Sequence, residues 1–218
     1  KDLGLNDAVI GLINASFFTS PRIKVSTHMK NNEFLLEYLS IKYPDQRFEN
    51  FIYVGVKRQE LDLYLNGNRI ISYPVSTSMH GAGTKAGSDM TPIGLHKIRG
   101  KFGSDAPIGG ILKARKYTGN IASIQTNPIK TGEDAITTRI LTLEGLENGI
   151  NKGGELDSYG RHIYIHGTAE EGLIGQPASH GCVRMKNEDV INLFNRVEKG
   201  LITIPFQGFP ESKLAHLT

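Results

Sequence analysis

The chain reads SHGCVR at residues 179–184 and IYIHG at residues 163–167. Cys182 is the only cysteine in the sequence, and His166 ends the apolar part of the upstream segment. A thiol is a strong nucleophile near neutral pH only as the thiolate, so it needs a base or a cation beside it. A lone cysteine is often a small buried hydrophobe, but the polar, glycine-bearing neighbours of Cys182 make a poor core sequence. The pattern therefore indicates a covalent cysteine enzyme with His166 as its base.

The residue before the cysteine favours a reactive turn. Gly181 lets the backbone turn sharply and lets a substrate approach closely. The main-chain N–H groups of Gly181 and Cys182 could then point at one spot. Two such donors are what an oxyanion hole requires when a carbonyl is attacked.

These residues together resemble the signature of the L,D-transpeptidase (YkuD-like) family. The resemblance rests on His166-Gly167 followed by SHGCVRM at residues 179–185. Weaker similarity extends over roughly residues 50–205, including TPIG at residues 91–94 and the run 161–175. The fold that it implies is mainly β, a sandwich or barrel-like catalytic domain with peripheral helices and an N-terminal helical extension.

The resemblance also implies a role for each residue of the site. Cys182 would be the nucleophile, and His166 would be its base. The backbone carbonyl of Gly167 would hold the imidazole in the useful tautomer, a role that a carboxylate plays in other enzymes. If Cys182 and His166 form an ion pair, the pKa of the thiol should lie below its ordinary value of about 8.5.

The remaining residues of the motif would shape the pocket around the thiol. Ser179 and His180 would form its floor, and Gly181 would contribute to the oxyanion hole. Arg184 would either hold the loop or bind a carboxylate of the substrate. Both interpretations of Arg184 stay open at this point, because the planar fork of arginine serves either one.

The activity that the resemblance implies is acyl transfer on peptidoglycan. Cys182 would form a thioester with a stem tetrapeptide, expel the terminal D-alanine and pass the acyl group to an amine. That amine would belong to another stem peptide or to an anchored wall protein, and carbapenems would acylate the same thiol. The alternatives are an L,D-carboxypeptidase or endopeptidase that uses water, and a wall-binding module without catalysis. The intact His166 and Cys182 argue against the last of these.

A zinc site is the main rival interpretation of the histidines. His162, His166, His180 and Cys182 are all possible ligands. If His162 and His166 share a strand, about 13 Å separates them, because each residue of a strand adds about 3.3 Å. The spacing patterns of strong zinc sites are also missing. We therefore expect no metal and no cofactor.

Composition limits the partners and the compartment. The chain has 218 residues, 39% hydrophobic residues and a formal net charge of +3, so it is typical of a globular protein. Without runs of Lys and Arg, a nucleic-acid partner is not expected. The sequence contains neither a transmembrane run nor a visible signal peptide at Lys1. A wall enzyme of the periplasm or cell envelope would therefore have had its export signal removed.

Periodicity divides the chain into three parts. Residues 1–46 are predicted to form a helical extension, with helices over residues 8–18 and after Asn31-Asn32. Residues 47–206 form the catalytic domain, and residues 207–218 form a tail. Predicted strands cover residues 51–56, 61–65, 70–75, 135–143, 162–166 and 201–205, with a hairpin turn at Asn66-Gly67.

The other predicted elements complete the catalytic domain. A helix begins at Asn187 and ends at Gly200, with Val190, Ile191, Phe194 and Val197 facing inward. Residues 77–91 and 100–120 are predicted to be long glycine-bearing loops that border the entrance to Cys182 and act as closing flaps. Glu170 and Glu171 are predicted to lie in a solvated loop.

Overall fold

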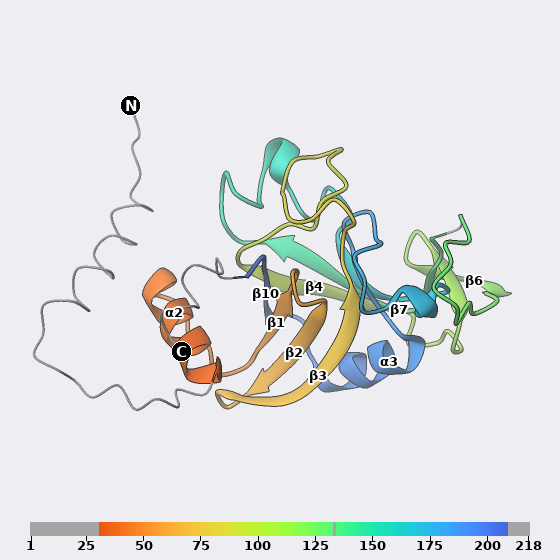
Figure 1. Cartoon of the computed structure of the whole chain (residues 1–218). Helices are drawn as coiled ribbons and strands as arrows, with labels where there is room; N and C mark the ends of the chain where they lie inside the picture. Colours follow the sequence, from red (N-terminus) through yellow and green to blue (C-terminus); the bar gives the residue numbers. More distant parts are fainter. Residues whose placement is uncertain (1–30, 133, 209–218) are drawn as a thin grey trace, which may run out of the picture.

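A computed structural model describes residues 31–132 and 134–208 of the chain (Figure 1). Its helices are α2 (Asn31–Lys42) and α3 (Asn187–Arg196), together with the short 3-10 helices η1 (Gly154–Leu156) and η2 (Glu171–Leu173). Its strands are β1 (Phe51–Gly55), β2 (Glu60–Leu65), β3 (Asn68–Ser76), β4 (His96–Phe102), β5 (Gly110–Lys113), β6 (Lys116–Ile121), β7 (Ile136–Gly145), β8 (Tyr164–Thr168), β9 (Val183–Met185) and β10 (Ile202–Phe206).

The strands of this region form one sheet that closes on itself. Their order is β4-β10-β1-β2-β3-β9-β8-β7-β5-β6, and β4 also pairs with β7. The additional pairing joins the two ends of the run from β4 to β7 and gives a barrel, with β5 and β6 as a hairpin outside it. Closing a sheet removes its exposed edges. The prediction of a mainly β, barrel-like fold with few helices is confirmed.

The predicted hairpin is present between β2 and β3. Asn66 and Gly67 have φ angles of 51° and 72°, and β2 and β3 pair antiparallel with Leu65 opposite Asn68. Positive φ at both central residues is the mark of a type I′ turn, whose twist matches that of the two strands. Asn and Gly are the residues that adopt this conformation most readily.

The barrel interior is the main hydrophobic core. It contains side chains from β1, β2, β3, β4, β7, β8 and β9 together with one face of α3. From that helix Val190, Leu193 and Phe194 are buried. The helix ends at Arg196 and not at Gly200, and Leu193 takes the inward position that was predicted for Ile191. The reason is that Val190, Leu193 and Phe194 follow the three- and four-residue spacing of one helical face.

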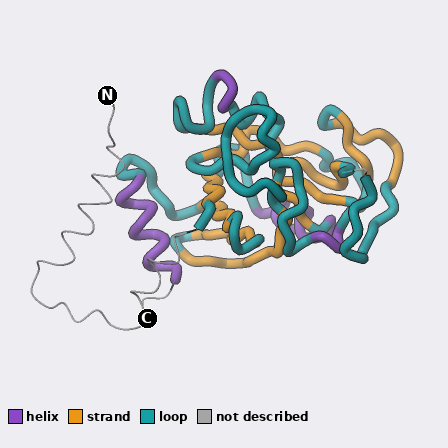
Figure 2. The backbone as a smooth tube through the Cα atoms, turned by 45° about the horizontal axis from the view of Figure 1, so that its top comes forward, coloured by secondary structure: helices purple, strands orange, loops and turns teal. Residues whose placement is uncertain are grey.

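A second core cluster joins α2 to the outside of the barrel. Leu35 and Leu39 of α2 pack with aromatic residues of β1 and β2, where the rings of Phe51 and Tyr64 stack at 4.4 Å. Figure 2 shows α2 in purple alongside the orange strands. The predicted division at residue 46 stays a prediction, because the described part of the extension packs on the catalytic domain. The predicted helix over residues 8–18 lies outside the described residues.

Two predictions about local structure are wrong. Residues 100–120 are not one long loop, since they contain the end of β4, all of β5 and most of β6. Short strands with glycines in them give a weak sequence signal, and here pairing with β7 decides the conformation. His162 does not lie on a strand either. It has a φ of 56° in the turn before β8, so the strand-spacing argument against zinc does not apply to it.

Candidate active site

The candidate base lies on β8, and the candidate nucleophile directly precedes the parallel strand β9. β8 pairs with β9 so that His166 lies opposite Arg184 and Gly167 opposite Met185. Cys182 directly precedes β9 and lies beside Tyr164, whose N–H donates to its Sγ at 3.4 Å. Since alternate residues of a strand share a face, Cys182 and His166 project to the same side of the sheet.

The thiol of Cys182 is half-buried in an apolar niche. Its Sγ donates to the His162 carbonyl oxygen at 3.5 Å, and the residue packs against Leu112, Ile140 and Tyr164. Burial raises the pKa of the Cys182 thiol to about 11, and the charge of Asp134 adds to this rise. The Tyr164 N–H, Arg161 and Arg184 oppose it. The expectation of a pKa below 8.5 is therefore wrong for this structure, which holds Cys182 as a neutral thiol near pH 7.

The imidazole of His166 is also neutral. Its Nδ1 lies 2.8 Å from the Gly167 carbonyl oxygen, and because a carbonyl only accepts, Nδ1 carries the proton. Nε2 is then an acceptor. Burial lowers the pKa of His166, while the Asp134 charge and the Gly167 carbonyl partly offset that effect. This is the tautomer that a general base needs, and the carbonyl of Gly167 holds it as predicted.

Gly167 is a glycine because the neighbouring strands approach closely. A Cβ at this position would lie 2.7 Å from the Thr137 carbonyl oxygen and 2.9 Å from Oδ1 of Asn187. Both atoms belong to a firmly bonded region, since Asn187 donates to the Thr168 carbonyl and accepts from Thr137 Oγ1. A larger residue would displace β8 and with it His166.

The turn before the nucleophile is held by Ser179. Its hydroxyl donates to the Cys182 carbonyl oxygen at 2.6 Å and accepts the Gly181 N–H at 3.2 Å. Gly181 has a φ of 119°, and a Cβ there would lie 3.2 Å from Ile163 Cδ1 and from the Met90 carbonyl. The Gly181 N–H is thus engaged within the protein. Outside the strand ladders, the Cys182 N–H has no acceptor among residues 31–132 and 134–208, which makes it the candidate oxyanion donor.

Arg184 is a structural residue in this fold. Its guanidinium is 1% exposed and lies 2.9 Å from both Glu170 Oε2 and Asp134 Oδ1, with Ser76 Oγ at 3.2 Å. The possibility that Arg184 binds a substrate carboxylate is therefore not supported, because burial leaves no accessible N–H. Its Nε is buried without a partner, so the network is not fully satisfied.

Glu170 corrects the prediction of a solvated acidic loop. It is 3% exposed and accepts from the N–H of Thr131 as well as from Arg184. These bonds hold the pKa of Glu170 below its usual value although burial opposes them. Glu171 accepts from Asn187. Two adjacent carboxylates thus tie the loop after β8 to the barrel.

Sequence reasoning missed Asp134 and Arg161. Asp134 joins the site across 50 residues, bonding Arg184 and lying 3.4 Å from His180 Nδ1. Arg161 lies in the run 161–175 that resembles the family, which was the only available signal. Neither residue has a local pattern that predicts its partners.

Residues 77–91 do border the site, but they form a firmly bonded rim and not a free flap. Ser78 bridges to Ser179, and the Ser78 N–H donates to Thr91 Oγ1. Arg161 Nη1 donates to the carbonyls of Gly83 and Thr84, and Nη2 donates to that of Met90. We call residues 77–91 the rim loop. Its attachment to Arg161 fixes it next to the catalytic turn.

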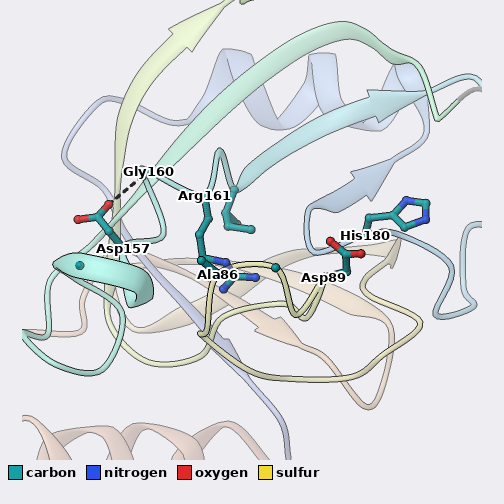
Figure 3. Close-up of a pocket in the computed structure, with 9 residues that line it drawn as sticks. Ala86, Asp89, Asp157, Gly160, Arg161 and His180 are labelled. Carbon is teal, nitrogen blue, oxygen red and sulfur yellow. Dashed lines mark hydrogen bonds between the residues drawn. The ribbon is translucent and has the colours of Figure 1, made fainter.

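A pocket lies between the rim loop and the turn at residues 153–161 (Figure 3). Its volume is about 330 Å³. Figure 3 shows Arg161 reaching towards Ala86, with Asp157 on one side of it and Asp89 and His180 on the other. The lining residues are Ala86, Gly87, Asp89, Gly154, Asp157, Gly160, Arg161, Ile163 and His180. Of the predicted site residues, His180 is the one that lines this pocket.

Within the described ranges, no group of three or more His, Cys, Asp and Glu side chains is arranged to hold a metal ion. The helices of the same residues include none that is long and apolar enough to cross a membrane.

The sequence matches the YkuD family, described as the L,D-transpeptidase catalytic domain, over residues 49–204. The match covers most of the chain and includes β1 to β9, the first three residues of β10 and the Cys182 turn. The chain belongs to this family.

Two curated relatives come from Bacillus subtilis. YqjB is 40% identical over 60 residues, which is 26% of this chain and 34% of the relative. YkuD is 34% identical over 82 residues, which is 35% of this chain and 50% of the relative. These matches thus span between one third and one half of the relatives' length.

Solved structures show a distant likeness. The L,D-transpeptidase from Mycobacterium smegmatis is 15% identical with a TM-score of 0.43, and the match covers 72% of this chain and 58% of that one. Bd1075 of Bdellovibrio bacteriovorus is 16% identical with a TM-score of 0.45, over 78% of this chain and 52% of that one.

Proposed function

We propose that the protein is a cysteine acyltransferase that acts on peptidoglycan stem tetrapeptides in the periplasm or cell envelope. The observation that carries the proposal is that the register of β8 and β9 puts Cys182 and His166 on the same face of the sheet, with His166 Nδ1–H held by the Gly167 carbonyl. Membership of the YkuD family supports the substrate class.

Acylation begins from the neutral pair. The Sγ of Cys182 attacks the carbonyl that precedes the terminal D-alanine, and His166 Nε2 takes the thiol proton as the S–C bond forms. The Cys182 N–H stabilises the oxyanion. When the C–N bond breaks, His166 returns the proton to the leaving amine, and the acyl group remains on sulfur as a thioester.

Deacylation reverses the same steps with a new nucleophile. The nitrogen of an acceptor amine attacks the thioester, and its proton passes through His166 to the departing sulfur. The acceptor would be another stem peptide or the lysine of an anchored wall protein. Burial raises the pKa of the Cys182 thiol, so the attack depends on a base that accepts the thiol proton, and His166 Nε2 takes that role.

The test uses purified muropeptides and intact-mass spectrometry. The wild-type protein should release D-alanine from the tetrapeptide and yield cross-linked dimers, and a short quench should show one acyl group on the protein. Hydrolysed product without dimers would assign water as the acceptor. If no product forms and no acyl group appears on Cys182, the proposed function is wrong. His180→Ala, which keeps Cys182 and His166, serves as a control for the assignment of the base.

A further inference from the structure

Arg161 is a cation beside the nucleophile that has no carboxylate partner in the described part of the chain. Arg184, two residues after Cys182, is neutralised by Glu170 and Asp134. Arg161 instead donates to three backbone carbonyls of the rim loop. Main-chain carbonyls orient a guanidinium but carry no net charge, so the positive charge of Arg161 is uncompensated by an ion pair.

The guanidinium keeps donors for a ligand. It has five N–H groups, and the three bonds to the rim loop use both on Nη1 and one on Nη2. The second Nη2–H and the Nε–H therefore have no acceptor within residues 31–132 and 134–208. The free Nε–H can donate to a carboxylate oxygen, and the charge of the guanidinium strengthens such a bond.

The pocket around Arg161 is open, and it reaches the motif around Cys182 through His180, while Cys182 and His166 do not line it. Four of its lining residues, Ala86, Gly87, Gly154 and Gly160, carry at most one methyl group, which leaves the cavity of about 330 Å³. Arg161 is joined to His162, whose carbonyl oxygen accepts from Cys182 Sγ at 3.5 Å. The charge of Arg161 also lowers the pKa of the Cys182 thiol, which shows that the two groups are near each other.

The two acidic residues of the pocket leave Arg161 available. Asp157 accepts the N–H groups of Gly153 at 3.0 Å and Gly160 at 2.8 Å, so its charge is stabilised by the turn. Asp89 lies beside His180 (Figure 3). Burial lowers the pKa of Arg161, and the charge of Asp89 opposes that effect without an ion pair between the two among the described residues. Neither carboxylate is within ion-pair distance of the guanidinium in the described residues.

We infer that Arg161 is a specificity-determining residue that binds the free α-carboxylate of the residue leaving from the acyl donor. The inference rests on the proposed function and adds to it the group that selects a donor with only one residue beyond the scissile bond. Consecutive residues are about 3.8 Å apart, so the terminal carboxylate of such a donor lies next to the attacked carbonyl. In a longer peptide that carboxylate is replaced by an amide, which carries no charge and cannot form an ion pair with arginine.

The experiment compares two donors in four proteins. The donors are the tetrapeptide with a free C-terminal D-alanine and the same peptide ending in D-alaninamide. The proteins are the wild type, Arg161→Met, Arg161→Lys and Arg47→Met. Arg47 is exposed and lies outside the site, so it serves as the matched control. The readout is the ratio of kcat/KM for the acid donor to that for the amide donor within each protein.

The ratio separates recognition from structure. Because Arg161 also holds the rim loop, Arg161→Met can lower both rates, but damage to the fold cancels in the ratio. The different leaving amines affect all four proteins equally. We expect the wild type and Arg47→Met to prefer the acid by about 10- to 100-fold, as for a hydrogen-bonded charge. Arg161→Met should show a ratio near one, and Arg161→Lys should lie between.

The outcomes that would overturn the role of Arg161 differ from those that would overturn the proposed function. A wild-type ratio near one, with both donors turned over, overturns the role of Arg161 and leaves the proposed function in place. A ratio in Arg161→Met equal to that of the wild type also overturns it. Turnover of neither donor by the wild type overturns the proposed function and this inference with it.

Discussion

The two sides of Cys182 place an arginine in opposite circumstances. On the side of β9, Arg184 is 1% exposed and contacts two carboxylates. On the side of the rim loop, Arg161 lines an open pocket, and its hydrogen bonds within the described residues go to backbone carbonyls. Both lie close in sequence to the catalytic pair, one five residues before His166 and the other two residues after Cys182.

The role of each arginine depends on the groups that its guanidinium contacts. A buried guanidinium between carboxylates holds elements together, and its charge is already matched. A guanidinium that is oriented by carbonyls keeps both its charge and some of its donors. The motif residue Arg184 therefore belongs to the framework, and the residue outside the motif is the one that faces a ligand.

The largest expected effect is the loss of turnover when the Cys182 thiol, which lies near both arginines, is removed. Cys182→Ala should lower muropeptide turnover by about 10³-fold or more, because no other group in the pair can form the thioester. The thermal unfolding midpoint should change little, since the thiol is only half-buried. Turnover above a few per cent of the wild type would show that the nucleophile lies elsewhere. A carbapenem should add its mass to the wild type and not to Cys182→Ala.

The next effect concerns stability on the Arg184 side. Arg184→Met should lower the free energy of unfolding by about 3–5 kcal/mol, because it leaves the buried carboxylate of Glu170 without its cation. Arg161→Met, on the open side, should cost about 1 kcal/mol. Urea unfolding of both variants measures the difference.

A double variant checks the cause of that effect. Adding Glu170→Gln to Arg184→Met should restore part of the lost stability, since the amide removes the unpaired charge and still accepts from Thr131. If Arg184→Met and Arg161→Met lower the free energy of unfolding equally, the contrast between the two arginines does not hold.

The raised pKa of the Cys182 thiol predicts a smaller effect, a fall in the free energy of unfolding at alkaline pH. The pKa is about 11 in the folded protein and about 8.5 in an unfolded chain. Folding therefore favours the protonated thiol, and this contribution is fully present below about pH 8.5 and is lost as the pH rises through 11. Because the thiol is partly exposed, we expect about 1–2 kcal/mol. The check is the free energy of unfolding from pH 8 to pH 11, with Cys182→Ala as reference. A constant difference between the two proteins would contradict the raised pKa.

The smallest expected effect is on the alkylation rate of Cys182, and it tests whether Arg161 acts on the thiol through its charge. Alkylation of Cys182 by iodoacetamide should rise about tenfold per pH unit without a plateau below about pH 11. A neighbouring cation favours the thiolate, so Arg161→Met should raise the pKa of the thiol and slow alkylation at pH 9 a few-fold. Arg161→Lys keeps the charge and should resemble the wild type. A plateau already at pH 8 would instead indicate a preformed ion pair with His166.

Local patterns predicted much of the fold. The Asn66-Gly67 turn, the alternating strands around it and the inward face of α3 all depend on residues near one another in the chain. The same holds for His166 and Gly167, because the tautomer is set by a bond between neighbouring residues. The β5–β6 hairpin escaped prediction, since its strands are short and depend on pairing with β7.

The sequence by itself determined the strands, the hairpin turn and the identity of the candidate nucleophile and base. Only the tertiary structure decided their environment. Arg184 meets Ser76 across 108 residues and Asp134 across 50, and Arg161 meets the rim loop across more than 70. Burial, ion pairing and the pKa of a thiol depend on which distant groups surround it, and no local pattern encodes those neighbours. For that reason the chain showed where its reactive cysteine is, and the folded barrel showed which arginine faces the pocket.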